Sequence, residues 1–342
     1  MRETKPRLPA KSRDAGPACL RAVCALLAMV VQLQAALAQR AEITPTATEL
    51  LRTAKSWGYQ LQNIDVGKLA RTSYDILVVD FPNGDGEGRI GKREVARLKR
   101  KATGERRIVL AYINIGEAED YRYYWRKSWA ASPPSWMGRQ NCRWKGDHRV
   151  RHWAQEWQAI IFGSAKSYLG RILAAGFDGA WLDRVDIHRY WTKDRATSFA
   201  DMVTFVERLS AWAKRRNPGF LVVPQNGEEL LADATYRAAI DGLGKEDLLF
   251  GDHGNDAANE PARIERALSF ISPVRAAGLP VLSVEYARAP AHRRLVLERH
   301  RALGFVPYIG PRSLAYLGTE GLPHPEDGDS EPLMEEAGGD GC

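Results

Sequence analysis

A chain of 342 residues with 44% hydrophobic residues can bury a substantial core, which favours a globular protein of one or two α/β domains. Its net charge of +7 would suit a nucleic-acid partner, but Arg and Lys are spread along predicted helices rather than clustered. We interpret these cations as solvated helix faces and expect no nucleic-acid partner. The 10 Trp and 12 Tyr suggest aromatic surfaces in a binding cleft, although Trp also packs in cores.

The first 38 residues have the pattern of a cleavable signal peptide. A basic start is followed by an apolar stretch at residues 22–37, and an Ala-x-Ala site ends at Ala38. The stretch is barely long enough to cross a bilayer, so an uncleaved anchor is the weaker interpretation. We expect cleavage after Ala38 and a secreted or periplasmic protein without stable membrane insertion.

The cysteines and the far end of the chain predict little further structure. Cys19 and Cys24 would leave with the signal, and only Cys142 and the terminal Cys342 would remain. We therefore expect no structural disulfide and no cysteine-based metal site. Residues 321–342 are rich in Pro, Gly and acidic residues, and we expect them to form a disordered tail.

Strand-like and helix-like segments alternate after a short helical lead-in at residues 44–55. Apolar runs bounded by turn residues predict strands at residues 57–62, 75–81, 107–115, 177–183, 220–225, 239–243, 279–286 and 305–309. Helical periodicity and helix-boundary signals predict helices at residues 92–101, 153–175, 197–216, 228–236, 262–276 and 292–302. Residues 118–150 are too long for a simple turn and are expected to form a loop over the third strand.

Eight strands that alternate with helices have the size and rhythm of an α/β fold, a (β/α)₈ TIM-like barrel. We expect this barrel to be a single domain over residues 39–320. An open doubly wound sheet is the main competitor, but no glycine-rich nucleotide-binding pattern follows any strand. The barrel is therefore the preferred fold.

Acidic residues follow most of the predicted strands. The run at residues 176–186 shows this best, because its apolar strand breaks at Asp183 and a second carboxylate follows at Asp186. Six of the eight strands deliver an acid in this way: Asp80; Glu117 and Glu119; Asp183 and Asp186; Glu228; Glu246 and Asp247; Glu285. Helix capping explains one or two such acids, but in a barrel the carboxyl ends of all strands surround one pocket.

A pocket lined by carboxylates, amides and aromatic rings suits a sugar. Rings stack on the apolar faces of sugars, and two carboxyl groups can divide the work of glycoside hydrolysis between an acid and a nucleophile or base. Crowded acids also raise one another's pKa values, which helps to keep one of them protonated. Excess carboxylates would attract a cationic sugar.

Metal chemistry is the competing class. His148 and His152 are four residues apart, as a ligand pair on a helix would be, but no further motif of a metal site accompanies them. No nucleophile elbow supports Ser or Cys chemistry. We expect no metal and no cofactor.

Several motifs together resemble glycoside hydrolase family 114, which includes endo-α-1,4-polygalactosaminidases. Residues 112–119 (YINIGEAE), with Tyr121-Arg122 and Tyr124-Trp125 after them, look like the strand-three signature of that family. The run at residues 176–186 is similar to its strand-four signature, and residues 241–246 and 284–287 complete the likeness. The resemblance covers roughly residues 57–317.

The resemblance implies a TIM-like barrel that hydrolyses an α-1,4-linked, galactosamine-containing polysaccharide. It implies Asp183 as the nucleophile and Glu246 as the acid/base. We expect the substrate-binding residues to be Asp80, Tyr112, Glu117, Glu119, Trp181, Asp186, Asn226, Glu285, Tyr286 and Tyr308.

The sequence therefore predicts a secreted, endo-acting, monomeric glycoside hydrolase that cleaves a cationic amino-sugar polymer such as biofilm or capsule material. A non-catalytic carbohydrate-binding barrel is the second hypothesis, and a metal-dependent polysaccharide deacetylase is the third. The presence of both candidate acids favours the enzyme, because a binding module would be free to lose either.

Overall fold

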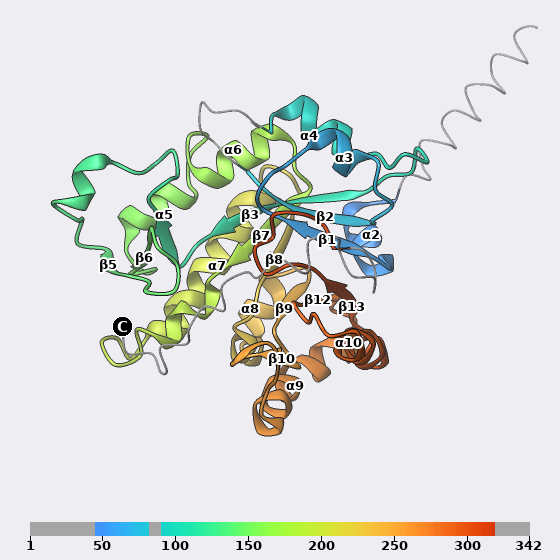
Figure 1. The fold of residues 1–342 in the computed structure, drawn as a ribbon. Helices are drawn as coiled ribbons and strands as arrows, with labels where there is room; N and C mark the ends of the chain where they lie inside the picture. Colours follow the sequence, from blue (N-terminus) through green and yellow to red (C-terminus); the bar gives the residue numbers. More distant parts are fainter. Residues whose placement is uncertain (1–44, 82–89, 319–342) are drawn as a thin grey trace, which may run out of the picture. The chain divides into compact units, whose positions relative to one another are not determined.

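The chain folds as a (β/α)₈ barrel, in which parallel strands lie at the centre and helices lie outside them (Figure 1). The computed structural model describes residues 45–81 and 90–318, so the predicted signal peptide and acidic tail lie outside the described residues. The barrel strands are β1 (Trp57–Gln60), β2 (Ile76–Asp80), β3 (Ile108–Asn114), β7 (Gly179–Asp183), β8 (Leu221–Pro224), β9 (Leu243–Glu246), β12 (Val281–Glu285) and β13 (Val306–Ile309).

The eight strands follow one another around the barrel in two hydrogen-bonded groups. The first group has the order β1-β2-β3-β7-β8, and the second has the order β9-β12-β13. A parallel bridge between Gln225 and Gly244 joins β8 to β9. Side chains span the other seam, where the Trp57 indole donates to the carbonyl of Val306 at 2.9 Å.

Two apolar cores follow from the alternation of side chains along the strands. One set, which includes Ile76, Val78 and Trp181, fills the interior of the barrel. The alternate set, which includes Leu77 and Val79, packs between the strands and the surrounding helices. Because both faces of each strand are buried, the strands are apolar nearly throughout.

The helices around the barrel broadly follow the sequence prediction. They are α2 (Ala47–Thr53), α3 (Val66–Ala70), α4 (Lys92–Leu98), α5 (Gln155–Ile161), α6 (Tyr168–Ala175), α7 (Ser198–Lys214), α8 (Ala234–Ala239), α9 (Pro261–Ala276) and α10 (Pro290–Ala302). The single helix expected at residues 153–175 is two helices. Gly163 adopts a φ of 113° between them, and Ser167 caps the second helix through the N–H of Gly170.

The sixth barrel strand was predicted too early in the chain, at residues 239–243. Residues 234–239 form α8, and the strand begins only at Leu243. The true strand contains Lys245, which made it look polar in the sequence. Its ammonium is buried and lies 2.7 Å from the carboxylate of Glu228, so a charged residue is accommodated within the strand.

The segment predicted as a loop over the third strand contains a small antiparallel sheet of its own. Its strands β4 (Glu117–Glu119), β6 (Asp147–Val150) and β5 (Met137–Gln140) pair in that order, and a short 3₁₀ helix, η1 (Lys127–Ala130), precedes β5. In Figure 1 this insertion lies to the left of the barrel strands. It therefore adds a wall beside the carboxyl end of β3.

Cys142, in this insertion, is disulfide-bonded, so the expectation of no structural disulfide was wrong. That expectation rested on the positions of the cysteines along the sequence. A disulfide depends instead on how close two cysteines lie in space, which linear separation does not reveal.

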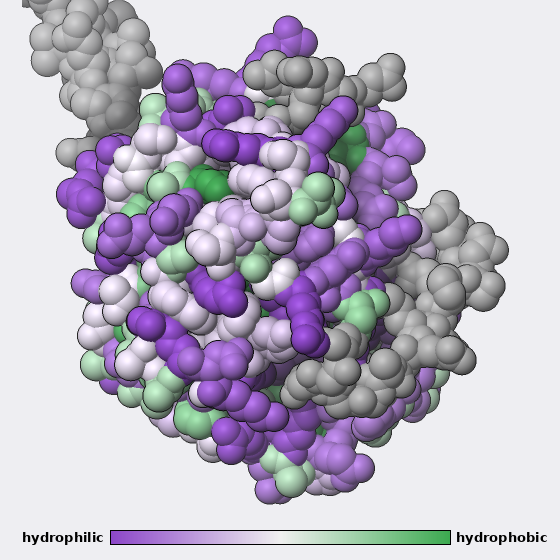
Figure 2. Space-filling model, turned by 90° about the vertical axis from the view of Figure 1, so that its left-hand side faces the viewer, coloured by the Kyte–Doolittle hydropathy of each residue, from purple (hydrophilic) through white to green (hydrophobic). Residues whose placement is uncertain are grey.

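The surface is predominantly hydrophilic on the face drawn in Figure 2, where hydrophobic residues are scattered singly among polar ones. Scattered apolar residues of this kind are normal for a solvated surface. Within residues 45–81 and 90–318, no helix has the length and hydropathy needed to cross a bilayer.

Candidate active site

The candidate site is built from the last inward-facing side chain of several barrel strands. On β2 the inward residues Ile76 and Val78 are followed by Asp80, and on β7 Trp181 is followed by Asp183. Because inward positions recur every second residue, the polar ends of neighbouring strands meet above the same aromatic interior. The cavity above this interior measures about 450 Å³.

Nine of the twelve site residues predicted from the sequence line this cavity, which we call the active-site cavity. They are Asp80, Tyr112, Glu117, Glu119, Asp183, Asp186, Asn226, Glu246 and Tyr286. The structure thus brings together residues from strands far apart in the sequence, and both predicted catalytic acids are among them.

Asp183 is the last residue of β7 and is held as an acceptor of hydrogen bonds. The Tyr112 hydroxyl donates to its carboxylate at 2.6 Å, and the backbone N–H of Arg184 donates at 2.7 Å. Burial raises the pKa of Asp183 to about 6, although Arg184 and the Tyr112 hydroxyl oppose the rise. At neutral pH this carboxyl is therefore mostly ionised, as a nucleophile must be.

Glu246 is the last residue of β9 and faces the same cavity. Burial raises its pKa to about 7, and the nearby carboxylates of Asp247 and Asp183 add to the rise. The Tyr286 hydroxyl donates to its Oε1 and acts in the opposite direction. Near neutral pH, Glu246 retains a proton more often than Asp183, which suits an acid that later acts as a base.

Gln225 connects the two acids. Its Nε2 donates to Oδ1 of Asp183 at 3.2 Å and to Oε2 of Glu246 at 2.9 Å. The Trp181 indole donates to Oε1 of Gln225 at 2.7 Å, which fixes the amide with its nitrogen toward the acids. Both carboxylate oxygens contact one nitrogen, so they are close to each other. Their distance is below ~6.5 Å, the shortest separation of the two catalytic carboxyl groups in inverting glycosidases.

The close approach of β9 to Trp181 requires a glycine. A Cβ at Gly244 would lie 2.3 Å from the indole ring of Trp181, far inside contact distance. The absence of a side chain at Gly244 therefore lets the ring fill the interior directly beneath Gln225 and Glu246.

Three strand ends of the site are followed by residues with left-handed backbone. Arg184, Asn226 and Asp247 have φ angles of 60°, 60° and 50°, although none is glycine. Each comes within one or two residues of an inward-facing polar side chain, at the point where the chain turns out of the barrel. Such strained positions cluster at functional sites because the surrounding structure must hold them.

Two arginines neutralise part of the acidic wall. Arg122 contacts Asp80 at 2.8 Å and Glu119 at 2.6 Å, and Arg184 lies 3.2 Å from Glu117. Burial nevertheless raises the pKa of Asp80. Seven carboxyl groups but only four cationic side chains line the active-site cavity, so its lining has an excess of acids.

Asp147 adds an acid that the sequence prediction missed. It lies on β6 opposite Glu119 on β4 and lines the active-site cavity. Burial, together with the neighbouring Glu119 and Glu117 carboxylates, raises the pKa of Asp147 to about 8. Two exposed aromatic residues, Tyr121 and Trp144, line the cavity from the same insertion.

Other missed residues carried a partial signal in the sequence. Gln225 ends the predicted fifth strand, and Tyr121 and Arg122 follow the third, so position alone could have placed all three. Asp147 and Trp144 had no such signal, because they belong to the insertion predicted as a loop.

Three predicted substrate-binding residues do not line the active-site cavity. Trp181 is fully buried one layer below it, where it orients Gln225. Tyr308 lies in the same interior layer and donates to the carbonyl of Tyr59 at 3.3 Å. The third is Glu285, which lies outside the barrel interior because outward and inward positions alternate along β12.

Glu285 instead holds a loop. Its carboxylate accepts hydrogen bonds from the backbone N–H groups of Leu248, Leu249 and Phe250 at 3.0, 2.8 and 3.3 Å. The Nε2 atom of His300 lies 3.2 Å from Oε1 of the same carboxylate, and both side chains are fully buried. This network stabilises the segment that follows β9.

The histidine pair considered for a metal does not share a helix face. His148 is in β6, whereas His152 lies beyond the strand and its Nε2 is 3.0 Å from the carbonyl of Ser198. The described part of the chain contains no group of three or more His, Cys, Asp or Glu side chains arranged to hold a metal ion.

Comparison with known proteins gives one matching family model and several similar structures. Residues 34–322 match the model of glycoside-hydrolase family GH114. An uncharacterized protein of Deinococcus radiodurans is 35% identical over 276 residues, which cover 79% of this chain and 84% of the relative. An uncharacterized protein of Methanocaldococcus jannaschii is 33% identical over 280 residues, which cover 77% of this chain and 78% of the relative.

Two solved structures share the fold. The glycoside hydrolase domain of PelA from Pseudomonas aeruginosa superposes with a TM-score of 0.59 at 17% identity, over 78% of this chain and 98% of that chain. Aspergillus fumigatus Ega3, in complex with galactosamine, gives a TM-score of 0.56 at 17% identity, over 80% of this chain and 96% of that chain.

Proposed function

The chain belongs to glycoside-hydrolase family GH114, and on that premise we propose that it is an endo-acting hydrolase of α-1,4-linked, galactosamine-containing polysaccharides. The observation that carries this proposal is the pair Asp183 and Glu246, joined by one amide nitrogen of Gln225. Two carboxyls with different pKa values in one cavity are what glycoside hydrolysis requires.

Asp183 is proposed to attack the anomeric carbon while Glu246 gives its proton to the leaving oxygen. The covalent sugar ester on Asp183 is then cleaved by water, from which Glu246 removes a proton. The short separation of the facing oxygens supports this two-step route. The new reducing end should therefore keep the anomeric configuration of the original bond.

The amino-sugar preference rests on the charge of the active-site cavity. Near neutral pH, Glu246 and Asp147 largely keep a proton, so about five carboxylates face four cations, and this excess favours a protonated amine over a neutral or anionic substituent. The similar structure Ega3 was solved with galactosamine, which fits the same chemistry. We also propose export of the protein, because residues 1–38 have the signal-peptide pattern.

Digestion of acetylated and de-N-acetylated α-1,4-galactosamine polymers, read by mass spectrometry, tests the proposal. The wild-type protein should release short oligosaccharides, and Asp183→Asn should lower kcat by about 10⁴-fold or more without changing the thermal unfolding curve. Near wild-type activity of Asp183→Asn would remove Asp183 from the mechanism.

The alternative hypotheses give different results in the same digest. Binding of polymer without cleavage would favour a carbohydrate-binding barrel. Release of acetate that a chelator abolishes would favour a metal-dependent deacetylase. The periplasmic or extracellular fraction of expressing cells should contain protein that begins at Gln39 if export and cleavage occur as proposed.

A further inference from the structure

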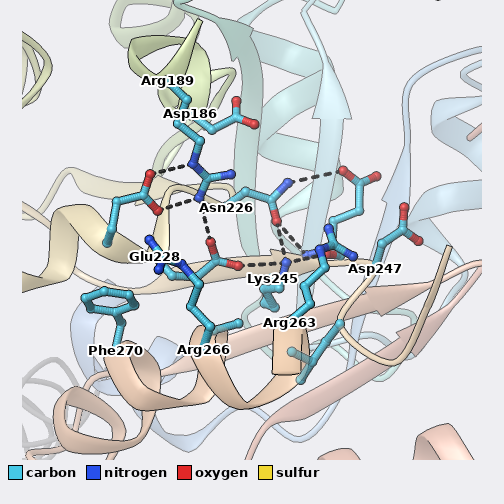
Figure 3. A pocket seen from close by; sticks show the side chains of 13 residues that line it. Asp186, Arg189, Asn226, Glu228, Lys245, Asp247, Arg263, Arg266 and Phe270 are labelled. Carbon is cyan, nitrogen blue, oxygen red and sulfur yellow. Dashed lines mark hydrogen bonds and ion pairs between the residues drawn. The ribbon is translucent and has the colours of Figure 1, made fainter. Parts of the chain in front are cut away.

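A second cavity lies beside the active-site cavity and shares part of its lining. We call it the lateral cavity; it measures about 380 Å³ and shares Asp186, Asn226 and Glu246 with the active-site cavity. Figure 3 shows its walls, which come from two 3₁₀ helices, η2 (Val185–Arg189) and η3 (Glu228–Ala232), from the end of β9, and from α9.

The two catalytic candidates border these cavities differently. Asp183 lines only the active-site cavity, whereas Glu246 lines both. In glycoside hydrolysis the nucleophile contacts the sugar that is retained, and the acid lies at the oxygen shared with the departing chain. The departing chain should therefore extend past Glu246 into the lateral cavity.

We propose that the lateral cavity binds the departing part of the polymer and accepts there an N-acetylated amino sugar in preference to one with a free amine. This inference rests on the proposed function. It concerns the two sugars on either side of the bond that is cut. Each sugar lies in a different cavity, and the two cavities present different charges to their sugars.

Four of the five carboxyl groups that line the lateral cavity lie within ion-pair distance of a cation, and the fifth, Glu246, is the proposed acid. Glu228 contacts Lys245 at 2.7 Å and Arg189 at 3.1 Å. Asp247 contacts Arg312 at 2.9 Å. Figure 3 shows the first of these groups as a connected network of dashed contacts. These acids are therefore poor partners for an additional ammonium group.

The opposite wall, formed by α9, adds positive charge. Arg263 and Arg266 project from α9 toward the cavity, and both are exposed (Figure 3). Arg263 forms an ion pair with Asp252, but Arg266 has no ion-pair partner within residues 45–81 and 90–318. An unpaired guanidinium repels a protonated amine and donates readily to a carbonyl oxygen.

An apolar surface lies next to these donors. Ala267 and Phe270, both half-buried, follow Arg266 on α9, and Leu248 contributes from the end of β9. An acetamido group offers a carbonyl for a guanidinium and a methyl group for such a surface. A free ammonium offers neither, so the lateral cavity matches the acetylated sugar.

Partially N-acetylated α-1,4-galactosamine oligosaccharides provide the test, with products sequenced by mass spectrometry. In the wild type, the sugar at each new non-reducing end comes from the lateral cavity and should be N-acetylated more often than in the starting material. The sugar at the new reducing end comes from the active-site cavity and should carry a free amine more often.

Arg266→Glu should reverse part of this preference, raising the ratio of free-amine to acetylated new non-reducing ends by roughly threefold, the scale of one exposed charge pair. Arg294→Glu is the matched control, because Arg294 is exposed on α10 and lines neither cavity. It should leave the ratio unchanged.

The outcomes separate this inference from the proposed function. No cleavage of any galactosamine polymer would overturn the proposed function. Cleavage with the same acetyl content at both new ends, or with a ratio that Arg266→Glu leaves unchanged, would overturn the assignment of the lateral cavity alone.

Discussion

Glu246 and Glu285 end neighbouring strands of the barrel, yet the structure uses them in opposite ways. Both are glutamates at the carboxyl end of a strand, on β9 and β12. Glu246 faces the active-site cavity, where burial and other carboxylates raise its pKa to about 7. Glu285 is fully buried outside the barrel interior and accepts three backbone hydrogen bonds.

The difference comes from the face of the strand on which each glutamate lies, because successive side chains point alternately into and out of the barrel. Gly244 and Glu246 occupy inward positions on β9, whereas Val284 and Tyr286 occupy them around β12 and leave Glu285 outside. A carboxylate surrounded by backbone N–H groups accepts their hydrogen bonds and holds the backbone in place. A carboxyl surrounded by other acids keeps its proton longer and is available for chemistry.

Substitution of the two glutamates is expected to differ most in its effect on catalysis. Glu246→Gln should lower kcat on natural polymer by about 10²–10⁴-fold, because an amide cannot protonate the leaving oxygen. A substrate with an activated leaving group needs little protonation and should lose less. Steady-state rates on both substrates measure the contrast, and equal losses on the two would contradict an acid role for Glu246.

The pH profile tests whether Glu246 and Asp183 act as a pair. Asp183 must be ionised, so kcat/KM should rise with pH until the region of its pKa of about 6. Glu246 must be protonated, so kcat/KM should fall above its pKa of about 7. Beyond each limit the change should approach about tenfold per pH unit. Since the two groups interact, the measured values belong to the pair.

Glu246→Gln supplies the control for this profile. On a substrate with an activated leaving group, the variant should lose the alkaline decline and keep the acidic one. An unchanged alkaline limb in the variant would show that some other group, for example Asp147 with its raised pKa, controls it.

The sequence was sufficient to predict the barrel and most of the acids that line the active-site cavity, because acids at strand ends converge in this fold. The sequence did not reveal in the same way which residues of each strand face into the barrel. Both faces of the strands are apolar, as at Ile76 and Leu77, so no polar alternation marked which positions face inward. Glu285, Trp181 and Tyr308 were therefore placed at the site by their position near strand ends alone.

Other features depend on contacts between distant segments. The role of Gln225 requires the indole of Trp181 on the neighbouring strand to orient its amide. The lateral cavity requires α9 to lie against η3, although the two are some thirty residues apart in the chain. Spacing in a single sequence carries no record of either contact.

The smallest effect on catalysis, and the sharpest test of the contrast, is expected for Glu285→Gln. The amide NH₂ would face backbone donors that the carboxylate now satisfies, so the free energy of unfolding should fall by about 1–3 kcal/mol. Because Glu285 does not line the active-site cavity, kcat of the folded variant should stay close to that of the wild type.

Urea unfolding and steady-state rates measured below the transition separate the two effects. Glu298→Gln, at an exposed position on α10, removes the same charge and should change stability by no more than about 0.5 kcal/mol. A large loss of kcat with unchanged stability in Glu285→Gln would mean that Glu285 acts in catalysis. Both glutamates would then have catalytic roles, and they would differ only in their distance from the substrate.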